Sequence, residues 1–87
     1  MKNETKIGSI TVAGQPTDEE LQTLAERGFT TVINNRLPEE LPEPEAVKIP
    51  SGISYAEIPF TGATLSRHEI ERTRAELAKA SGQVLIH

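Results

Sequence analysis

Four residues with polar side chains follow the apolar runs of this sequence. Asn35 and Arg36 follow the run TTVIN, Thr61 follows YAEIPF, and His87 follows QVLI. If these runs are parallel strands of one sheet, their carboxyl ends meet at one rim, which is where open α/β sheets bind ligands. An arginine and small polar groups at such a rim can hold an anion through charge-assisted hydrogen bonds. We therefore predict that these four residues lie at the rim where chemistry takes place, with Arg36 as a candidate anion ligand.

Each rim residue also has a purely structural interpretation. Arg36 can pair with a nearby carboxylate, Glu39 or Glu40. Asn34 and Asn35 can form hydrogen bonds with backbone groups of the loop, as short polar side chains do in turns. His87 can simply be the polar end of a strand.

The histidine and cysteine content limits the chemistry of the chain. There is no cysteine, and the two histidines are His68 and His87. Disulfides and thiolate metal sites are thereby excluded, and a histidine metal site has little to draw on. We expect no metal and no cofactor, with His68 at the surface.

Charge and hydropathy narrow the class of partner. The net charge is −4, and no three Lys or Arg residues are adjacent, which argues against nucleic acid or an anionic membrane as a partner. No apolar stretch is long enough for a secretory signal or a membrane-spanning helix. A cytoplasmic protein is the expectation.

Strand patterns occur at four places in the chain. Short β-branched or apolar runs bounded by turn residues predict strands at Ile7–Ala13, Thr30–Asn35, Ile53–Ile58 and Gln83–His87. The last run is unbroken at Val84–Ile86, which is typical of a strand covered on both faces. We therefore predict that it lies at the centre of the sheet.

Two helices are predicted between the strands. In the first, Thr17 and Glu20 form a capping-box pair, Pro16 can pack on Leu21, and Gly28 supplies the stop, with Leu21, Leu24 and Ala25 facing inward. In the second, Ser66 and Glu69 form the corresponding pair and Gly82 the stop. Its expected inward residues are Ile70, Thr73, Leu77 and Ala78, with Leu65 and Ile70 as a hydrophobic staple.

The segment Arg36–Pro50 breaks this alternation. It contains four prolines and four glutamates, which block a sustained strand or a long helix. We predict a long loop with one helical turn at Glu43–Val47. The glutamates at 39, 40, 43 and 45 are interpreted as a solvated face.

The order of elements predicts one α/β domain over residues 1–87, with a four-stranded, mainly parallel sheet and right-handed crossovers. Two helices cannot cover both faces of such a sheet, so much of one face stays bare. We therefore expect an incomplete domain that lacks its C-terminal helices. Self-association through the uncovered face is a further expectation.

Three stretches carry a family resemblance. The run ITVAGQPTDEELQTLAERGFTTVINNR, followed by YAEIPF and VLIH, resembles the bacterial protein-tyrosine-phosphatase-like family, the phosphatase-like domain of beta-lactamase-hydrolase-like proteins. The resemblance covers nearly the whole chain, with the Pro/Glu loop contributing little. It implies a cysteine-phosphatase-like fold that is also rhodanese-like, and a phosphorylated or other anionic small molecule or peptide as the substrate.

The resemblance also implies a reactive loop of the pattern H-C-x-x-G-x-R, in which His87 matches the histidine. The cysteine is the nucleophile, and the arginine and backbone amides hold an oxyanion. Such a loop needs successive N–H groups and a helix N-terminus around a thiolate with a depressed pKa. Residues 1–87 contain no cysteine, so we expect a chain truncated before this loop and inactive as it stands.

The resemblance leaves the reaction open. Dual-specificity phosphatases place an Asp shortly after the third strand as general acid, but this chain has Thr61 and Gly62 there and no carboxylate before Glu69. The missing carboxylate weakens the argument for phosphatase chemistry and leaves rhodanese-like sulfurtransfer as an alternative. A non-catalytic module that binds an anion or a partner is the other alternative.

Overall fold

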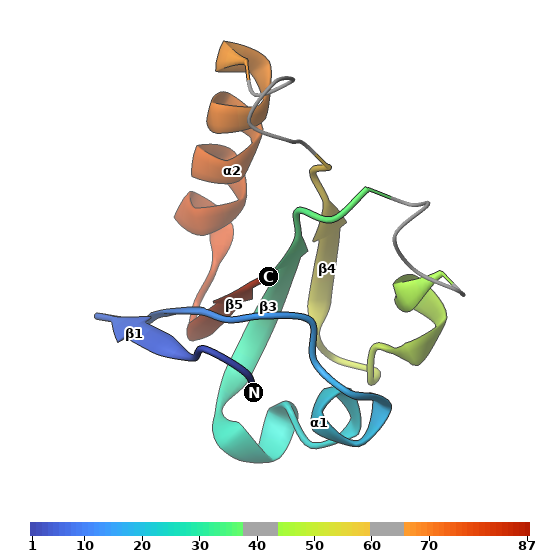
Figure 1. Ribbon diagram of the computed structural model, residues 1–87. Coiled ribbons are helices and arrows are strands. Elements are labelled where there is room, and N and C mark those ends of the chain that lie inside the picture. The colour runs from blue at the N-terminus through green and yellow to red at the C-terminus, as the bar shows by residue number, and fades with distance from the viewer. Residues whose placement is uncertain (38–43, 60–65) are drawn as a thin grey trace.

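The computed structural model describes residues 1–37, 44–59 and 66–87, and Figure 1 shows strands alternating with helices along the chain. The order of elements is β1 (Thr5–Ile7), β2 (Ile10–Val12), α1 (Asp18–Gln22), the 3-10 turn η1 (Ala25–Arg27), β3 (Phe29–Asn34), the 3-10 turn η3 (Glu45–Lys48), β4 (Ser54–Glu57), α2 (Arg67–Lys79) and β5 (Gln83–Ile86).

The strands form one mostly parallel sheet. Its order is β1-β2-β5-β3-β4, with β1 antiparallel to β2 and every other neighbouring pair parallel. The last strand therefore lies between β2 and β3, which confirms its predicted central position. The α/β class is confirmed as well, but the sheet has five strands where the sequence predicted four.

The fifth strand comes from the segment predicted as one strand at Ile7–Ala13. This segment is a hairpin in which Ile7 pairs with Ile10 across the two-residue loop Gly8–Ser9. Gly8 has a φ of 60°, the positive value that a type II′ turn requires at its first loop position. The prediction of a single strand was wrong because the turn has only two residues, Gly8 and Ser9, and β-branched residues lie on both sides of it.

The first predicted helix begins as expected. The side-chain oxygen of Thr17 accepts from the Glu20 N–H at 3.1 Å, and the Glu20 carboxylate accepts from the Thr17 N–H at 2.8 Å. This is the capping box that the sequence predicts. The buried residues Leu21 and Leu24 then face the core.

The same helix is shorter than predicted. The Thr23 hydroxyl donates to the backbone oxygens of Glu19 and Glu20 at 3.3 and 3.1 Å, and such local bonds compete with a continuing helix. The chain tightens into η1 and reverses at Gly28, whose φ is 87°. Ala25, predicted to face inward, is exposed.

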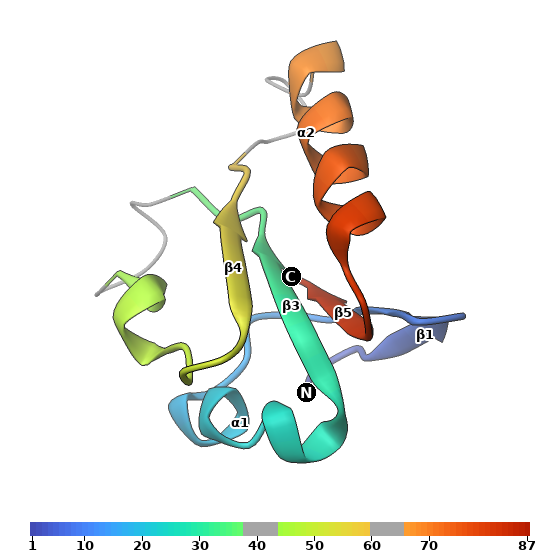
Figure 2. The same ribbon diagram turned by 180° about the vertical axis from the view of Figure 1, so that it is seen from behind.

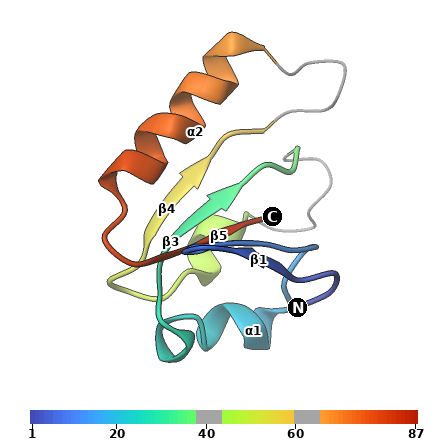
Figure 3. The same cartoon turned by 90° about the vertical axis from the view of Figure 1, so that its left-hand side faces the viewer.

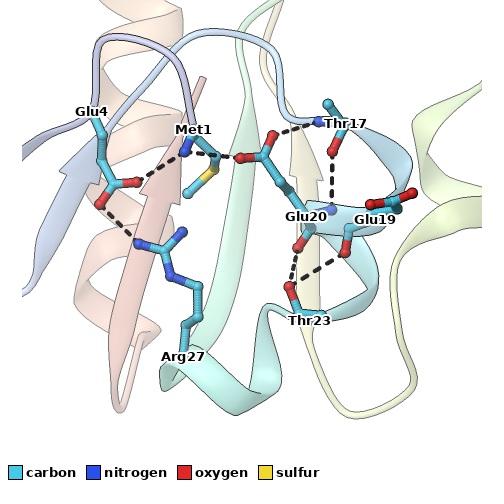
Figure 4. A network of polar contacts seen from close by, with 7 residues as sticks. All are labelled: Met1, Glu4, Thr17, Glu19, Glu20, Thr23 and Arg27. Carbon is cyan, nitrogen blue, oxygen red and sulfur yellow. Dashed lines mark hydrogen bonds and ion pairs between the residues drawn. The ribbon is translucent and has the colours of Figure 1, made fainter.

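Figure 4 shows how the start of the chain is fixed to α1. The Met1 α-amino group lies 2.8 Å from the Glu20 carboxylate and 3.3 Å from that of Glu4, which also pairs with Arg27 at 2.8 Å. The hydrogen bond from the α-amino group is the main reason that the pKa of Glu20 lies below its usual value. Surface ion pairs of this kind add little stability, so their effect is mainly to define the path of the chain before β1.

The sheet separates two hydrophobic cores. Leu21, Leu24, Phe29, Val32 and Leu85 form one core, and Ile33, Ile58 and Val84 form the other, against which Leu77 and Ala80 pack. Figures 2 and 3 show α2 on one side of the sheet, and Figure 3 shows α1 on the opposite side. Each core is small, as expected for a sheet with few covering helices.

The remaining element boundaries differ from the predictions by a few residues. The predicted turn at Glu43–Val47 is η3, which begins two residues later, and the predicted strands at Thr30–Asn35 and Ile53–Ile58 are β3 and β4. Strand β5 ends at Ile86, one residue earlier than predicted.

Helix α2 also departs from its prediction. Its cap residue is Ser66, but the hydroxyl donates to the Glu69 carboxylate instead of accepting a backbone N–H. The helix ends at Lys79, before the predicted stop at Gly82. Ile70 and Ala78, both predicted to face inward, are exposed. The predicted staple partner Leu65 lies outside the described residues.

No helix in the described parts of the chain has the length and apolar character needed to span a bilayer.

Apolar side chains are exposed on the α2 side of the sheet. Strand pairing places Ile7 and Val12 on the same face as Val84 and Ile86, because directly paired residues project to one side. Ile7 is 65% exposed and Val12 is 42% exposed. The predicted self-association through this face stays a prediction.

We expect the 87-residue chain to sediment as more than a monomer at micromolar concentration, because exposed apolar surface on a sheet face favours association. The variant Val12→Ser should shift the chain toward the monomer in sedimentation velocity. Val47→Ser changes an exposed apolar residue of η3 and is the matched control. Equal effects of the two variants would contradict an interface on this face.

Gly82 is required where α2 returns to the sheet. A Cβ at this position would lie 2.6 Å from Thr30 Cγ2 and 3.0 Å from Thr30 Oγ1. We expect Gly82→Ala to lower the free energy of unfolding by about 1–3 kcal/mol, as overpacking does. Urea denaturation measures the loss, and Thr30→Ala in the same chain should recover most of it. An equal loss with and without Thr30→Ala would contradict the steric explanation.

Candidate functional site

The carboxyl ends of three parallel strands meet at one rim of the sheet. The Asn35 N–H donates to the His87 carbonyl oxygen at 2.7 Å, and the His87 N–H donates to that of Ile33 at 3.1 Å. The Asn35 side chain donates to the Ile58 carbonyl oxygen at 3.0 Å, just after β4. The predicted convergence of Asn35 and His87 is therefore present. Thr61 lies outside the described residues.

The His87 side chain is buried and is held by a carboxylate. Its Nε2 lies 2.6 Å from Glu45 Oε2, and the other carboxylate oxygen accepts from Gln15 Nε2 at 2.7 Å. The three side chains come from the loop after β2, from η3 and from the end of β5. The sheet and its connections thus bring together residues that are far apart in the sequence.

The position of Glu45 differs from the one predicted from the sequence. It was grouped with the glutamates at 39, 40 and 43 as a solvated face, but it is only 2% exposed. The 3-10 turn places its side chain under the sheet rim, where His87 and Gln15 bind both oxygens. The other three glutamates lie outside the described residues. Nothing in the Pro/Glu-rich sequence distinguishes Glu45 from them.

Glu45 remains a carboxylate in spite of its burial. Burial raises the pKa of this carboxyl, but the hydrogen bonds from His87 and Gln15 lower it by more, so that the pKa lies below its usual value. A carboxylate only accepts hydrogen bonds, which means that His87 Nε2 carries a proton and donates. His87 Nδ1 is buried and has no hydrogen-bond partner among residues 1–37, 44–59 and 66–87.

A second polar chain supports the rim from β3 and β4. Asn34 Nδ2 donates to the Tyr55 hydroxyl at 2.9 Å, and the Asn34 side-chain oxygen accepts from the Arg36 N–H at 2.9 Å. The Tyr55 hydroxyl donates toward Glu57 at 3.4 Å. Burial is the main reason that the pKa of Tyr55 is raised, so this hydroxyl stays protonated. Asn34 thereby fixes the backbone where Arg36 leaves the sheet.

Arg36 lies half-buried where the chain leaves the rim. Its backbone position next to Asn35 agrees with the predicted location. The alternative pairing with Glu39 or Glu40 concerns residues outside the described ones. A role of the Arg36 guanidinium in anion binding stays a prediction.

A groove lies beside the rim on the α2 side of the sheet. It has a volume of about 400 Å³. Helix α2 contributes Glu69, Ile70, Thr73, Arg74 and Leu77 to its wall. The sheet contributes Asn35 and Ile86, the residue before His87. The groove and the rim are therefore continuous.

No cluster of three or more metal-binding side chains occurs within the described ranges. His68 is exposed in the first turn of α2, as predicted. The groups gathered at the rim are hydrogen-bonding groups, and the one carboxylate that contacts His87, Glu45, is buried and already bound by two donors.

The fold is a mostly parallel α/β sheet whose central strand is followed directly by a buried histidine. The sequence matches the family described as "Beta-lactamase hydrolase-like protein, phosphatase-like domain" over residues 4–87. The chain belongs to this family.

Curated relatives support the same assignment. The chain is 30% identical to a beta-lactamase hydrolase-like protein of Agrobacterium fabrum, with 90% of this chain and 20% of that protein covered. It is 27% identical to a protein of the same name from Xylella fastidiosa, with the same coverage. The chain thus spans about a fifth of the length of these relatives.

Solved structures share the fold. A candidate phosphatase of the DUF442 group from Shewanella putrefaciens CN-32 superposes with a TM-score of 0.80 at 21% identity, over 99% of this chain and 60% of that one. A mutant form of Tk-PTP gives a TM-score of 0.70 at 25% identity, over 97% of this chain and 59% of that one. The fold is therefore phosphatase-like, and the chain spans about 60% of these structures.

We expect the stability of the fold to depend on Glu45 in acid. The folded-state pKa of Glu45 lies below its usual value of 4.5, so its stabilisation is complete above that pH and is lost as the pH falls through the folded-state pKa. Glu45→Gln should lower the free energy of unfolding by about 2 kcal/mol near neutral pH and flatten its decline in acid.

Urea denaturation from pH 7 to pH 3 measures this effect. The exposed Glu26→Gln is the matched control, and the lowered pKa values of Glu4, Glu20 and Glu69 contribute equally to both variants. An acid dependence that is the same in wild type and Glu45→Gln would contradict the assignment.

Proposed function

We propose that the rim at the ends of β3, β4 and β5 is the base of a phosphoester-binding site in a phosphatase-like hydrolase domain. The observation that carries the proposal is His87, which sits at the carboxyl end of the central strand with its side chain held at 2.6 Å by Glu45. Asn35 joins the same rim by a backbone hydrogen bond of 2.7 Å. Family membership over residues 4–87 supports this reading.

The reaction would be hydrolysis of a phosphoric ester by a cysteine thiolate. In such chemistry the thiolate attacks phosphorus, the ester oxygen leaves, and water then hydrolyses the phosphocysteine. Residues 1–87 contain no cysteine, so we propose that they do not catalyse this reaction alone. Their contribution is to fix the strand end from which a reactive loop departs.

The anion would be held mainly by groups near the rim. Arg36 leaves the sheet there with its backbone N–H bound by Asn34 at 2.9 Å, and we propose that its guanidinium contacts the phosphate. We propose a phosphorylated small molecule or peptide as the substrate class. Rhodanese-like sulfurtransfer and anion binding without turnover are the competing outcomes of the experiment below.

A chimera tests the proposal. Residues 1–87 are joined to the part of the Shewanella domain that they do not cover, and the product is assayed with an aryl phosphate. We expect hydrolysis by the chimera and background rates for residues 1–87 alone.

Two results would contradict the proposal. One is a folded chimera that transfers sulfur from thiosulfate to cyanide but does not hydrolyse the aryl phosphate. The other is hydrolysis by the purified 87-residue chain, with the intact mass checked against 9.5 kDa.

In the chimera, Arg36→Lys keeps the positive charge but removes the bidentate guanidinium. This variant should raise KM more than it lowers kcat.

A further inference from the structure

We infer that Glu45 is a positioning residue for His87: it fixes one tautomer and one ring orientation of the imidazole at the rim. The catalytic meaning of this inference rests on the proposed function, but the contact itself does not. The sequence pattern predicts a solvated Glu45, whereas the structure buries it.

The geometry restrains the imidazole through a single strong contact. His87 Nε2 and Glu45 Oε2 are 2.6 Å apart, and the side chains are 0% and 2% exposed. A charge-assisted hydrogen bond of this length is shorter than a neutral one. Because water does not reach the pair, no solvent molecule can replace either partner.

The carboxylate is itself held in place. Gln15 Nε2 donates to Glu45 Oε1 at 2.7 Å, so rotation of the carboxylate to release His87 would break two hydrogen bonds. Orientation of a functional group by a partner that is itself hydrogen-bonded is the arrangement found around preorganised sites. Gln15 is therefore the second member of the arrangement.

Stability alone does not account for this pair. Burial of a charged group is costly, and well-packed apolar residues of the same volume are often at least as stable as a buried ion pair. A carboxylate that faces a histidine directly after the central strand does have one specific effect, which is to set the ring's tautomer.

The consequence lies at the second ring nitrogen. With the proton on Nε2 directed to Glu45, a neutral His87 keeps Nδ1 as an acceptor. Nδ1 is buried and has no partner within the described ranges. It is therefore available to a hydrogen-bond donor from a loop that assembles at the rim. The neutral ring can keep this acceptor only while Nε2 is protonated.

Besides Glu45 itself, η3 carries Lys48, and helix α1, which contacts η3, carries Asp18, Glu19 and Glu20. Lys48 pairs with Asp18 at 3.0 Å. Glu45 is contributed by η3, and Tyr55 and Glu57 are contributed by β4. The Tyr55 hydroxyl contacts Asn34 at 2.9 Å and Glu57 at 3.4 Å, and its hydrogen bond to Glu45 contributes to the lowered pKa of that carboxyl. Glu45 is thus the carboxylate that contacts the imidazole directly.

Nitrogen NMR of the histidine rings in the 15N-labelled 87-residue chain tests the inference, and it needs no catalytic activity. Measured where the ring is neutral, His87 is expected to be a single tautomer with the proton on Nε2 and with Nδ1 unprotonated. The exposed His68 should show averaged tautomers and serves as the internal reference.

Glu45→Gln is the decisive variant. Glutamine has the same shape but can present either an oxygen or an N–H to the ring, so the single state of His87 should be replaced by a mixture. Glu57→Gln is the matched control on β4 and should leave the His87 signals unchanged. Gln15→Ala should retain the Nε2–H form but broaden the His87 signals, because Glu45 loses its second anchor.

Three results would overturn the inference: His87 with Nε2 unprotonated in wild type, His87 signals unaffected by Glu45→Gln, or an equal change in Glu57→Gln. Backbone amide spectra verify that each variant is folded, and Glu45→Asp gives a second variant that keeps the charge with a shorter reach. If Glu45→Asp and Glu45→Gln perturb the ring equally, charge has no part in the effect. A failed chimera assay with a positive NMR result would reject the proposed function and leave the contact standing.

Discussion

The pairing of β5 on both sides is the constraint on which the rest of this structure depends. Strand β5 is hydrogen-bonded to β2 on one edge and β3 on the other, although it is formed last along the chain. Its Val84 belongs to one core and its Leu85 to the other. A strand that joins two cores and two halves of a sheet cannot shift register without disturbing all of them. The position of His87 is therefore fixed by the whole fold.

The polar groups around the rim follow from the same constraint. Because β3 and β5 are parallel and in register, Asn34 and His87 emerge on the α1 side of the sheet, where Gln15, Glu45 and Tyr55 also lie. Two separate hydrogen-bonded chains form there, one centred on Glu45 and one on Asn34. The opposite side of the rim opens into an apolar groove. The rim thus has one polar side that is already organised and one apolar side that is open.

Features set by neighbouring residues were predicted well from the sequence. Thr17 and Glu20 define the start of α1 by themselves, and the apolar run before His87 indicated a central strand. Contacts between distant segments were predicted only where the order of parallel strands implies them, as for Asn35 and His87. Glu45 is separated from His87 by 42 positions, and its inward direction depends on how η3 lies under the sheet. The hairpin at Gly8 was not predicted, because its two-residue turn interrupts the β-branched pattern only briefly. Thr61 lies outside the described residues.

The hairpin at the start of the chain also affects how the sheet ends. Strand β1 has only three residues, all exposed, and one of them is Lys6. A short edge strand with a charged residue is a poor template for another chain's backbone, and native proteins use such edges to avoid fibre-like stacking. Without β1, the N–H and C=O groups on the outer edge of β2 would be unpaired, and β2 would be the edge strand beside the central strand β5. The hairpin therefore protects this edge of the sheet from pairing with strands of other molecules.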